Sequence, residues 1–181
     1  MTPFPDLQRL ADLVAVNQHR WTAALIVDLA DHGGARFVSL IHRLGIGRDS
    51  LSRTLEATGA AGWVMRNPGY GHPLRPEYVL TPEGIRLAAM AKQQLVAQSQ
   101  IGIGPQVLTR WSVPIIHSLG TGLQRFNDVA RTLPQASPRA LSQGLRALTA
   151  NQLVNRTLFE SHPPISLYTL TSTGQILAQA V

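Results

Sequence analysis

The fold of this chain is decided by residues 126–148, which read FNDVARTLPQASPRALSQGLRAL. Apolar residues at helical spacing predict one short helix that stops at Pro134 and a second helix that begins at Ser137-Pro138. Serine caps free backbone N–H groups, and proline fits the first helical turn. The apolar stripe of the second helix consists of Leu141, Leu145 and Leu148.

The second helix also carries a polar face. Arg139, Gln143 and Arg146 have the spacing i, i+4 and i+7, on a face without a large apolar residue. In the major groove of DNA, glutamine pairs with adenine and arginine pairs with guanine. A short helix, a tight turn and a helix with such a face are typical of a helix-turn-helix. A solvated helix face is the alternative interpretation of these three residues.

The flanking sequence completes a larger motif. Helical spacing predicts a helix over 111–119, ahead of the two helices described above. Residues 153–159 are predicted to form a strand, 160–164 a turn and 165–170 a returning strand, and a closing helix begins near Thr171. Three helices followed by a hairpin make a winged helix, in which the hairpin is the wing.

This pattern occurs twice in the 181-residue chain. Arg20-Trp21 recurs 90 residues later as Arg110-Trp111, and Tyr78-x-Leu80-Thr81 recurs at the same offset as Tyr168-x-Leu170-Thr171. Matches in register over about 70 residues indicate a duplication, so each copy must make a similar fold. In the first copy we expect helices at 7–14, 21–29, 37–44 and 51–58, and strands at 63–66 and 75–80.

We therefore expect a mainly α protein with small β-hairpin wings (α+β), built from two tandem winged helix-turn-helix domains. The first domain is predicted to span residues 1–100, with an additional N-terminal helix and a closing helix. A linker rich in glycine and proline follows at 101–108, and the second domain spans 109–181. We expect the two copies to pair within the chain as a pseudo-dimer; a homodimer of the whole chain is the other arrangement considered.

The order of these motifs resembles the HxlR-type winged-helix family, and the resemblance covers about 80% of the chain. It implies a bacterial, DNA-binding transcription regulator. Members normally work as homodimers, whose recognition helices enter major grooves roughly 34 Å apart. Some members sense oxidants through a cysteine, a route closed to this chain because it has no cysteine. The matching segments are Arg110-Trp111, Arg125-Phe126, 137–148, 153–156 and 164–174, with Arg20-Trp21, Arg36-Phe37, 51–55, 63–66 and 73–84 in the first copy.

Candidate DNA-binding residues lie on the two recognition helices and the two wings. Asp49 and Glu56 stand where the second copy has Arg139 and Arg146, and acidic residues repel phosphate. The second copy is therefore the stronger predicted DNA reader, and the first copy either reads an asymmetric half-site or has lost DNA binding. The candidates are Arg139, Ser142, Gln143, Arg146, Arg156 and His162 in the second copy, and Arg48, Ser52, Arg53, Arg66, Tyr70, His72 and Arg75 in the first.

Composition agrees with a nucleic-acid partner. The formal net charge is +6, and 15 of the 16 basic residues are arginine, which favours phosphate and guanine contacts. GC-rich coding is the alternative cause of that bias. The N-terminus does not resemble a signal peptide, and no apolar run is long enough to span a membrane, so we expect a cytoplasmic protein.

Other function classes find little support in the sequence. The six histidines show no metal-ligand spacing, and no nucleophile elbow or phosphate loop occurs, so we expect neither an enzyme nor a bound cofactor. The predicted function is a sequence-specific regulator, repressor-like, that binds double-stranded DNA. A winged-helix scaffold for protein–protein contacts is the alternative. A small-molecule effector between the copies is compatible with the sequence, which does not locate its pocket.

Overall fold

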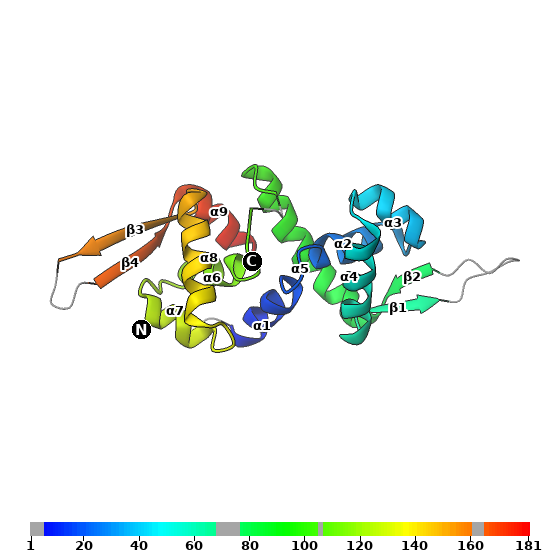
Figure 1. Ribbon diagram of the computed structural model, residues 1–181, viewed down its shortest axis with the longest axis horizontal. Coiled ribbons are helices and arrows are strands. Elements are labelled where there is room, and N and C mark those ends of the chain that lie inside the picture. The colour runs from blue at the N-terminus through cyan, green and yellow to red at the C-terminus, as the bar shows by residue number, and fades with distance from the viewer. Residues whose placement is uncertain (1–5, 68–76, 105–106, 161–164) are drawn as a thin grey trace, which may run out of the picture. The chain divides into compact units, whose positions relative to one another are not determined.

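The computed structural model describes residues 6–67, 77–104, 107–160 and 165–181 (Figure 1). The chain divides into two compact units. One unit contains residues 21–95, and the other contains the described residues up to Arg20 together with those from Val96 onward.

The unit of residues 21–95 holds the first winged helix. Its helix and strand order is the predicted one, with β1 paired antiparallel to β2, so that Val64 faces Leu80. The elements are α2 (Thr22–His32), α3 (Phe37–Leu44), α4 (Arg48–Ala60), β1 (Val64–Asn67), β2 (Glu77–Leu80) and the first part of α5 (Pro82–Gln100).

The other unit holds the second winged helix, in the same order. Its wing is an antiparallel hairpin in which Val154 faces Leu170 and Phe159 faces Ile165. Two tandem winged helix-turn-helix domains, mainly α with small β-hairpins, are therefore confirmed. The elements are α6 (Ser112–Gly120), α7 (Phe126–Thr132), α8 (Pro138–Ala150), β3 (Val154–Phe159), β4 (Ile165–Leu170) and α9 (Ser172–Ala180).

The start of α8 follows the sequence prediction closely. The Ser137 hydroxyl accepts a hydrogen bond from the Ala140 N–H at 3.2 Å, and Pro138 occupies the first helical position. The equivalent helix α4 begins after Gly47, which has no side chain to act as a cap. The recognition helix of the second copy thus has a side-chain cap that the first one lacks. The cap lies at the helix N-terminus, where helices bind anions.

Each winged helix has its own apolar core. In the first copy, side chains from α2, α3 and α4 are fully buried, and in the second copy side chains from α6, α7 and α8 take the same places. Trp111 is buried, whereas Trp21, Phe37 and Phe126 are half-buried at the edges of these cores. The central residues are Leu25, Ile26, Leu29, Leu40 and Leu51 in the first copy, and Ile115, Ile116, Val129, Leu141 and Leu145 in the second.

The N-terminal helix α1 (Leu7–Val16) packs against α6 of the second copy, although the sequence places it beside the first. Its stripe of Leu10, Leu13 and Val16 is buried. The Asp6 carboxylate caps the helix by accepting hydrogen bonds from two backbone N–H groups. An amphipathic pattern shows that a helix needs a core, but it does not show which core the helix joins.

In each copy an isolated β-bridge joins the returning strand of the wing to the residues just before the helix-turn-helix. Ala35 pairs with Tyr78 through two backbone hydrogen bonds of 2.8 and 2.9 Å. In the second copy Arg125 bridges Leu167, and the Tyr168 N–H donates to the Gln124 carbonyl at 2.8 Å. The returning wing strand is therefore anchored directly before the first helix of each helix-turn-helix.

The closing helix begins at a crowded junction with the wing. In the first copy the Thr81 hydroxyl donates to the Gly62 carbonyl at 2.7 Å and accepts from the Gly84 N–H at 3.2 Å. The Thr81 N–H donates to the Trp63 carbonyl at 2.9 Å. A Cβ atom at Gly84 would lie 2.1 Å from the Trp63 carbonyl oxygen, so only glycine fits there. The second copy repeats the junction with Thr171 and Gly174.

We expect Gly84→Ala to destabilise the unit of residues 21–95 by about 1–3 kcal/mol or more, because the added methyl group collides with rigid backbone. Gly59→Ala is the matched control in the same unit. Its added Cβ would meet no atom closer than 3.7 Å, and it should gain up to about 1 kcal/mol of helix propensity. Urea unfolding followed by circular dichroism measures both changes. Equal stability of the two variants would contradict the crowded junction.

Candidate nucleic-acid interface

Helix α8 separates an apolar face from a polar one. Its three stripe leucines are buried, and Arg139, Gln143 and Arg146 are exposed on the other side. Ser142 is half-buried between the two faces. The three residues predicted to read bases therefore share one solvent-facing surface.

A groove of about 450 Å³ runs between α8 and the wing of the second copy. It brings together three predicted DNA-binding residues, Ser142, Arg146 and Arg156, with Thr149 and Tyr168 beside them. Arg156 lies on β3 and donates two hydrogen bonds to the Ser166 hydroxyl on β4, at 3.2 and 2.9 Å. Two guanidinium groups and three hydroxyl groups in one groove suit a phosphate group.

A second hollow, of about 370 Å³, lies at the N-terminus of α8. Its lining includes Arg110, Gln143 and the capping residue Ser137. The Arg110 guanidinium carbon lies 4.7 Å from the ring centroid of Trp111, a cation–π distance that orients the exposed arginine. The sequence singled out Arg110 only as a marker of the repeat. Its adjacency to Trp111 was the signal that could have identified an oriented cation beside the recognition helix.

The corresponding surface of the first copy has mixed charge. Arg48, Ser52 and Arg53 are exposed on α4, and so are Asp49 and Glu56. The predicted wing residue Arg66 is exposed on β1. The remaining predicted residues Tyr70, His72, Arg75 and His162 lie outside the described part of the chain.

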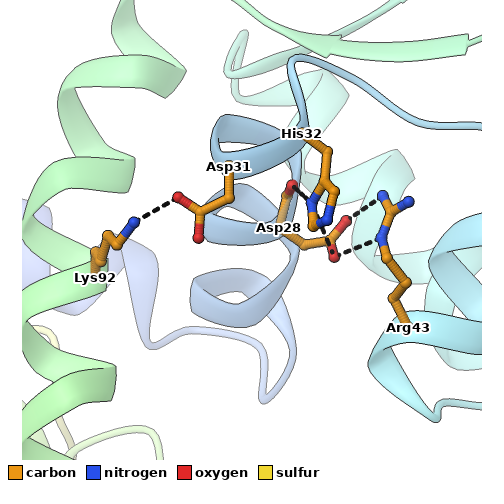
Figure 2. A network of polar contacts seen from close by, with 5 residues as sticks. All are labelled: Asp28, Asp31, His32, Arg43 and Lys92. Atoms are coloured by element: carbon orange, nitrogen blue, oxygen red, sulfur yellow. Dashed lines mark hydrogen bonds and ion pairs between the residues drawn. The ribbon is translucent and has the colours of Figure 1, made fainter.

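An ion pair fixes the first helix of the first helix-turn-helix against α2 (Figure 2). Arg43 on α3 donates from Nε and Nη2 to the two carboxylate oxygens of Asp28, at 2.8 and 2.6 Å. The Asp28 side chain is only 9% exposed. Hydrogen bonding to Asp28 raises the pKa of Arg43 above its ordinary value, against the opposing effect of burial. His32 also approaches Asp28, with Nδ1 2.8 Å from the main-chain oxygen.

The second copy makes the same connection without charge. Ser118 and Thr132 occupy the positions equivalent to Asp28 and Arg43, and their hydroxyl oxygens lie 3.0 Å apart. Ser118 is fully buried and also donates to the Pro114 carbonyl at 3.0 Å. Both copies thus hold the helix-turn-helix by one polar contact at equivalent positions, but only the contact of the first copy depends on ionised groups.

We expect Arg43→Ala to destabilise the unit of residues 21–95 by about 1–3 kcal/mol, because it leaves a nearly buried carboxylate without its bidentate partner. Arg86→Ala, which removes the exposed partner of Glu83 in the same unit, should cost less than about 1 kcal/mol. Urea unfolding at two salt concentrations measures both. Equal stability of the two variants would contradict a structural role for the Asp28–Arg43 contact.

The described residues contain no group of three or more histidine, cysteine, aspartate or glutamate side chains that could hold a metal ion. They also contain no helix long and apolar enough to cross a membrane.

Three helices, a hairpin wing and an exposed arginine–glutamine face define a winged helix-turn-helix protein. The family model described as HxlR-like helix-turn-helix matches residues 16–99 and again 106–181. The chain belongs to this family and contains two copies of its domain.

Several relatives are similar over one domain's length. HTH-type transcriptional regulator YodB of Bacillus subtilis is 39% identical over 72 residues, which is 40% of this chain and 63% of the relative. Uncharacterized HTH-type transcriptional regulator YtfH of Escherichia coli is 35% identical over 75 residues, 41% of this chain and 60% of the relative. Uncharacterized HTH-type transcriptional regulator YvaP of Bacillus subtilis is 36% identical over 69 residues, 38% of this chain and 64% of the relative. The matches span about three-fifths of the length of these relatives.

Proposed function

We propose that this protein is a sequence-specific DNA-binding transcription regulator, repressor-like, whose second winged helix makes the main DNA contacts. The observation that carries the proposal is the arginine-rich surface formed by α8 and the β3–β4 wing, with Arg146 and Arg156 in one groove. The names of the relatives, all HTH-type transcriptional regulators, support the same class of function.

In this proposal α8 enters the major groove of double-stranded DNA. Arg139, Gln143 and Arg146 read base edges, because their side chains are exposed on one face of the helix. Ser142 and Arg156 hold a backbone phosphate in the groove beside the wing. The charge balance favours this copy, since residues 105–181 contain six basic and two acidic residues, against ten basic and eight acidic in 1–104.

The first copy has a different role in the same complex. Arg48, Ser52, Arg53 and Arg66 are exposed and available for phosphate or base contacts. The acidic residues on α4 repel phosphate, but a carboxylate can accept a hydrogen bond from the amino group of cytosine. We therefore propose an asymmetric operator, with a strong half-site for α8 and a weaker one for α4.

We further propose that the two copies act as an intramolecular pseudo-dimer, with domains 1–100 and 109–181 joined by the linker 101–108. Support comes from α1, which precedes the first copy in sequence but packs on α6 of the second. Helix α5 likewise begins in one compact unit and ends in the other. The chain thus passes between the two compact units twice, after Arg20 and within α5, which keeps two half-sites at a high effective concentration.

A protein–protein scaffold is the second candidate function. It is favoured by one observation, the exposed Asp49 and Glu56 on the recognition helix of the first copy. Salt dependence distinguishes the two functions, because phosphate contacts release counterions when they form. A DNA reader should lose at least about tenfold in affinity between roughly 50 and 200 mM salt.

The first experiment measures fluorescence anisotropy of labelled fragments that flank the protein's own gene, with excess competitor DNA. In Arg139→Ala/Arg146→Ala, each lost base contact should cost about 1–3 kcal/mol, so affinity should fall at least about thirtyfold. Arg86→Ala is the matched control, because this exposed arginine lies on α5 and pairs with Glu83. No competitor-resistant binding, or binding that the double variant keeps, would favour the scaffold.

A charge exchange between equivalent positions tests the asymmetry. Glu56→Arg should strengthen binding and steepen the salt dependence by about one counterion, since it replaces a repelled carboxylate by a phosphate-binding group. Arg146→Glu should weaken binding more than Arg146→Ala, because it places a carboxylate that phosphate repels where a phosphate-binding group stood. Anisotropy over a salt series measures both changes. Weaker binding by Glu56→Arg would instead indicate that Glu56 itself reads a base.

A further inference from the structure

The second copy contains another hollow, of about 560 Å³, which is distinct from the groove beside α8. Its walls come from α6, the turn that follows it, β4 and α9. Leu119, Leu170 and Ala178 supply apolar surface, and the described residues that line the hollow include no lysine, arginine, aspartate or glutamate. The polar lining residues include His117, Thr121, Gln124, Tyr168, Gln175 and Gln179.

His117 lines this hollow, and one of its ring nitrogens is buried without a partner among the described residues. Its Nδ1 lies 3.0 Å from the main-chain oxygen of Val181, so Nδ1 carries the proton. Nε2 is buried and has no hydrogen-bond partner among the described residues. Burial lowers the pKa of His117, and Arg9 acts in the same direction, whereas the bond to Val181 and the charge of Asp6 oppose them. The ring is therefore neutral at neutral pH, with Nε2 as a buried, unsatisfied acceptor.

The first copy shows that the fold does not require these polar residues. Val27, Ile85 and Ala89 occupy the positions of His117, Gln175 and Gln179, so the first copy is apolar there. Asp31 occupies the position of Thr121 and is held by Lys92 of α5 at 2.5 Å (Figure 2). Since both copies form the same winged helix, the fold does not need the polar residues that line the hollow of the second copy.

Tyr168 connects this hollow to the proposed DNA-binding surface. It lines the hollow and also lines the groove that contains Arg146 and Arg156. Its backbone N–H holds the Gln124 carbonyl, and Gln124 lines the hollow as well. A molecule in the hollow would therefore contact the strand position that carries one wall of the arginine groove.

We propose that the hollow binds a neutral small molecule of one or two rings, held beside His117 by the side-chain amides of Gln124, Gln175 and Gln179. The volume lies within the usual range for small-molecule sites, and the lining offers amide groups for orientation and apolar surface for the rings. We also propose that occupancy changes DNA affinity through Tyr168, and this second part rests on the proposed function.

Binding is tested without DNA. The probes are a library of neutral one- and two-ring alcohols and lactams that includes benzyl alcohol and cyclohexanol, with benzoate and benzylamine as charged probes of matched size. The readout is the side-chain nitrogen NMR signals of the six histidines, of which five serve as internal references. Neutral probes should shift the His117 signal saturably, and the charged probes should not. No shift by any library member would overturn the proposal.

Two variants assign the site. His117→Val introduces the residue of the first copy, and Gln175→Ala changes an exposed position on α9 that should not affect folding. Probe affinity, followed by the ligand's own NMR signals, should fall at least about tenfold in each, while His19→Ala should bind as the unchanged protein does. Undiminished binding by Gln175→Ala and His117→Val would show that the probes bind elsewhere and would overturn the site.

The coupling is tested by anisotropy with and without the tightest probe. Saturation should change DNA affinity at least about fivefold in the unchanged protein and not in His117→Val. Unchanged DNA affinity despite probe binding would overturn the coupling but leave the binding site in place. If the protein binds no DNA at all, the proposed function fails while the NMR result still decides the site.

Discussion

The winged helices depend on one crowded junction, where the closing helix packs against the main chain that leads from the recognition helix into the wing. In the second copy the Thr171 N–H donates to the Leu153 carbonyl, and a Cβ atom at Gly174 would lie 2.0 Å from that same oxygen. The end of α8, the start of β3 and the start of α9 are therefore fixed to one another. Arg146 and Arg156 can line one groove because their two elements meet at this point. The capping threonine and the unsubstituted glycine are both needed, since one supplies the hydrogen bonds and the other the space.

Comparison of the two copies shows which residues the winged-helix fold requires and which residues can differ. Leu51 and Leu141 are both fully buried at equivalent positions, and the threonine–glycine junction is the same in both copies. The polar contact between the first two helices of each winged helix differs. An ion pair joins α2 and α3, whereas two hydroxyl groups meet between α6 and α7. A buried position is constrained by volume, whereas a polar contact needs only complementary partners. The recognition faces follow the same logic, because exposed residues of α4 and α8 carry different charges on the same helix geometry.

The sequence was sufficient to predict the helices and strands, but it did not predict the contacts between elements that lie far apart in the chain. Ser137-Pro138 predicts the first turn of α8, and the structure has the predicted cap, because capping is decided by neighbouring residues. The hairpins and the closing helix of the second copy also begin near the predicted residues. The packing of α1 on α6 could not be predicted, since any apolar core satisfies an amphipathic helix. The groove of Ser142, Arg146 and Arg156 was predicted only as separate residues, because its shape depends on how the strands of the wing pack beside α8.

The position of Tyr168 explains why a ligand site and a DNA-binding surface can share so small a domain. A winged helix has few layers, and Tyr168 of β4 lines both the hollow beside the closing helix and the groove beside the recognition helix. A hollow on one side of the returning strand and a groove on the other must therefore share wall residues. In the first copy the positions equivalent to His117, Gln175 and Gln179 are apolar, and an Asp31–Lys92 ion pair links α2 directly to α5. The polar hollow of the second copy omits that link, so the strand that anchors its wing is open to a molecule seated between α6 and α9.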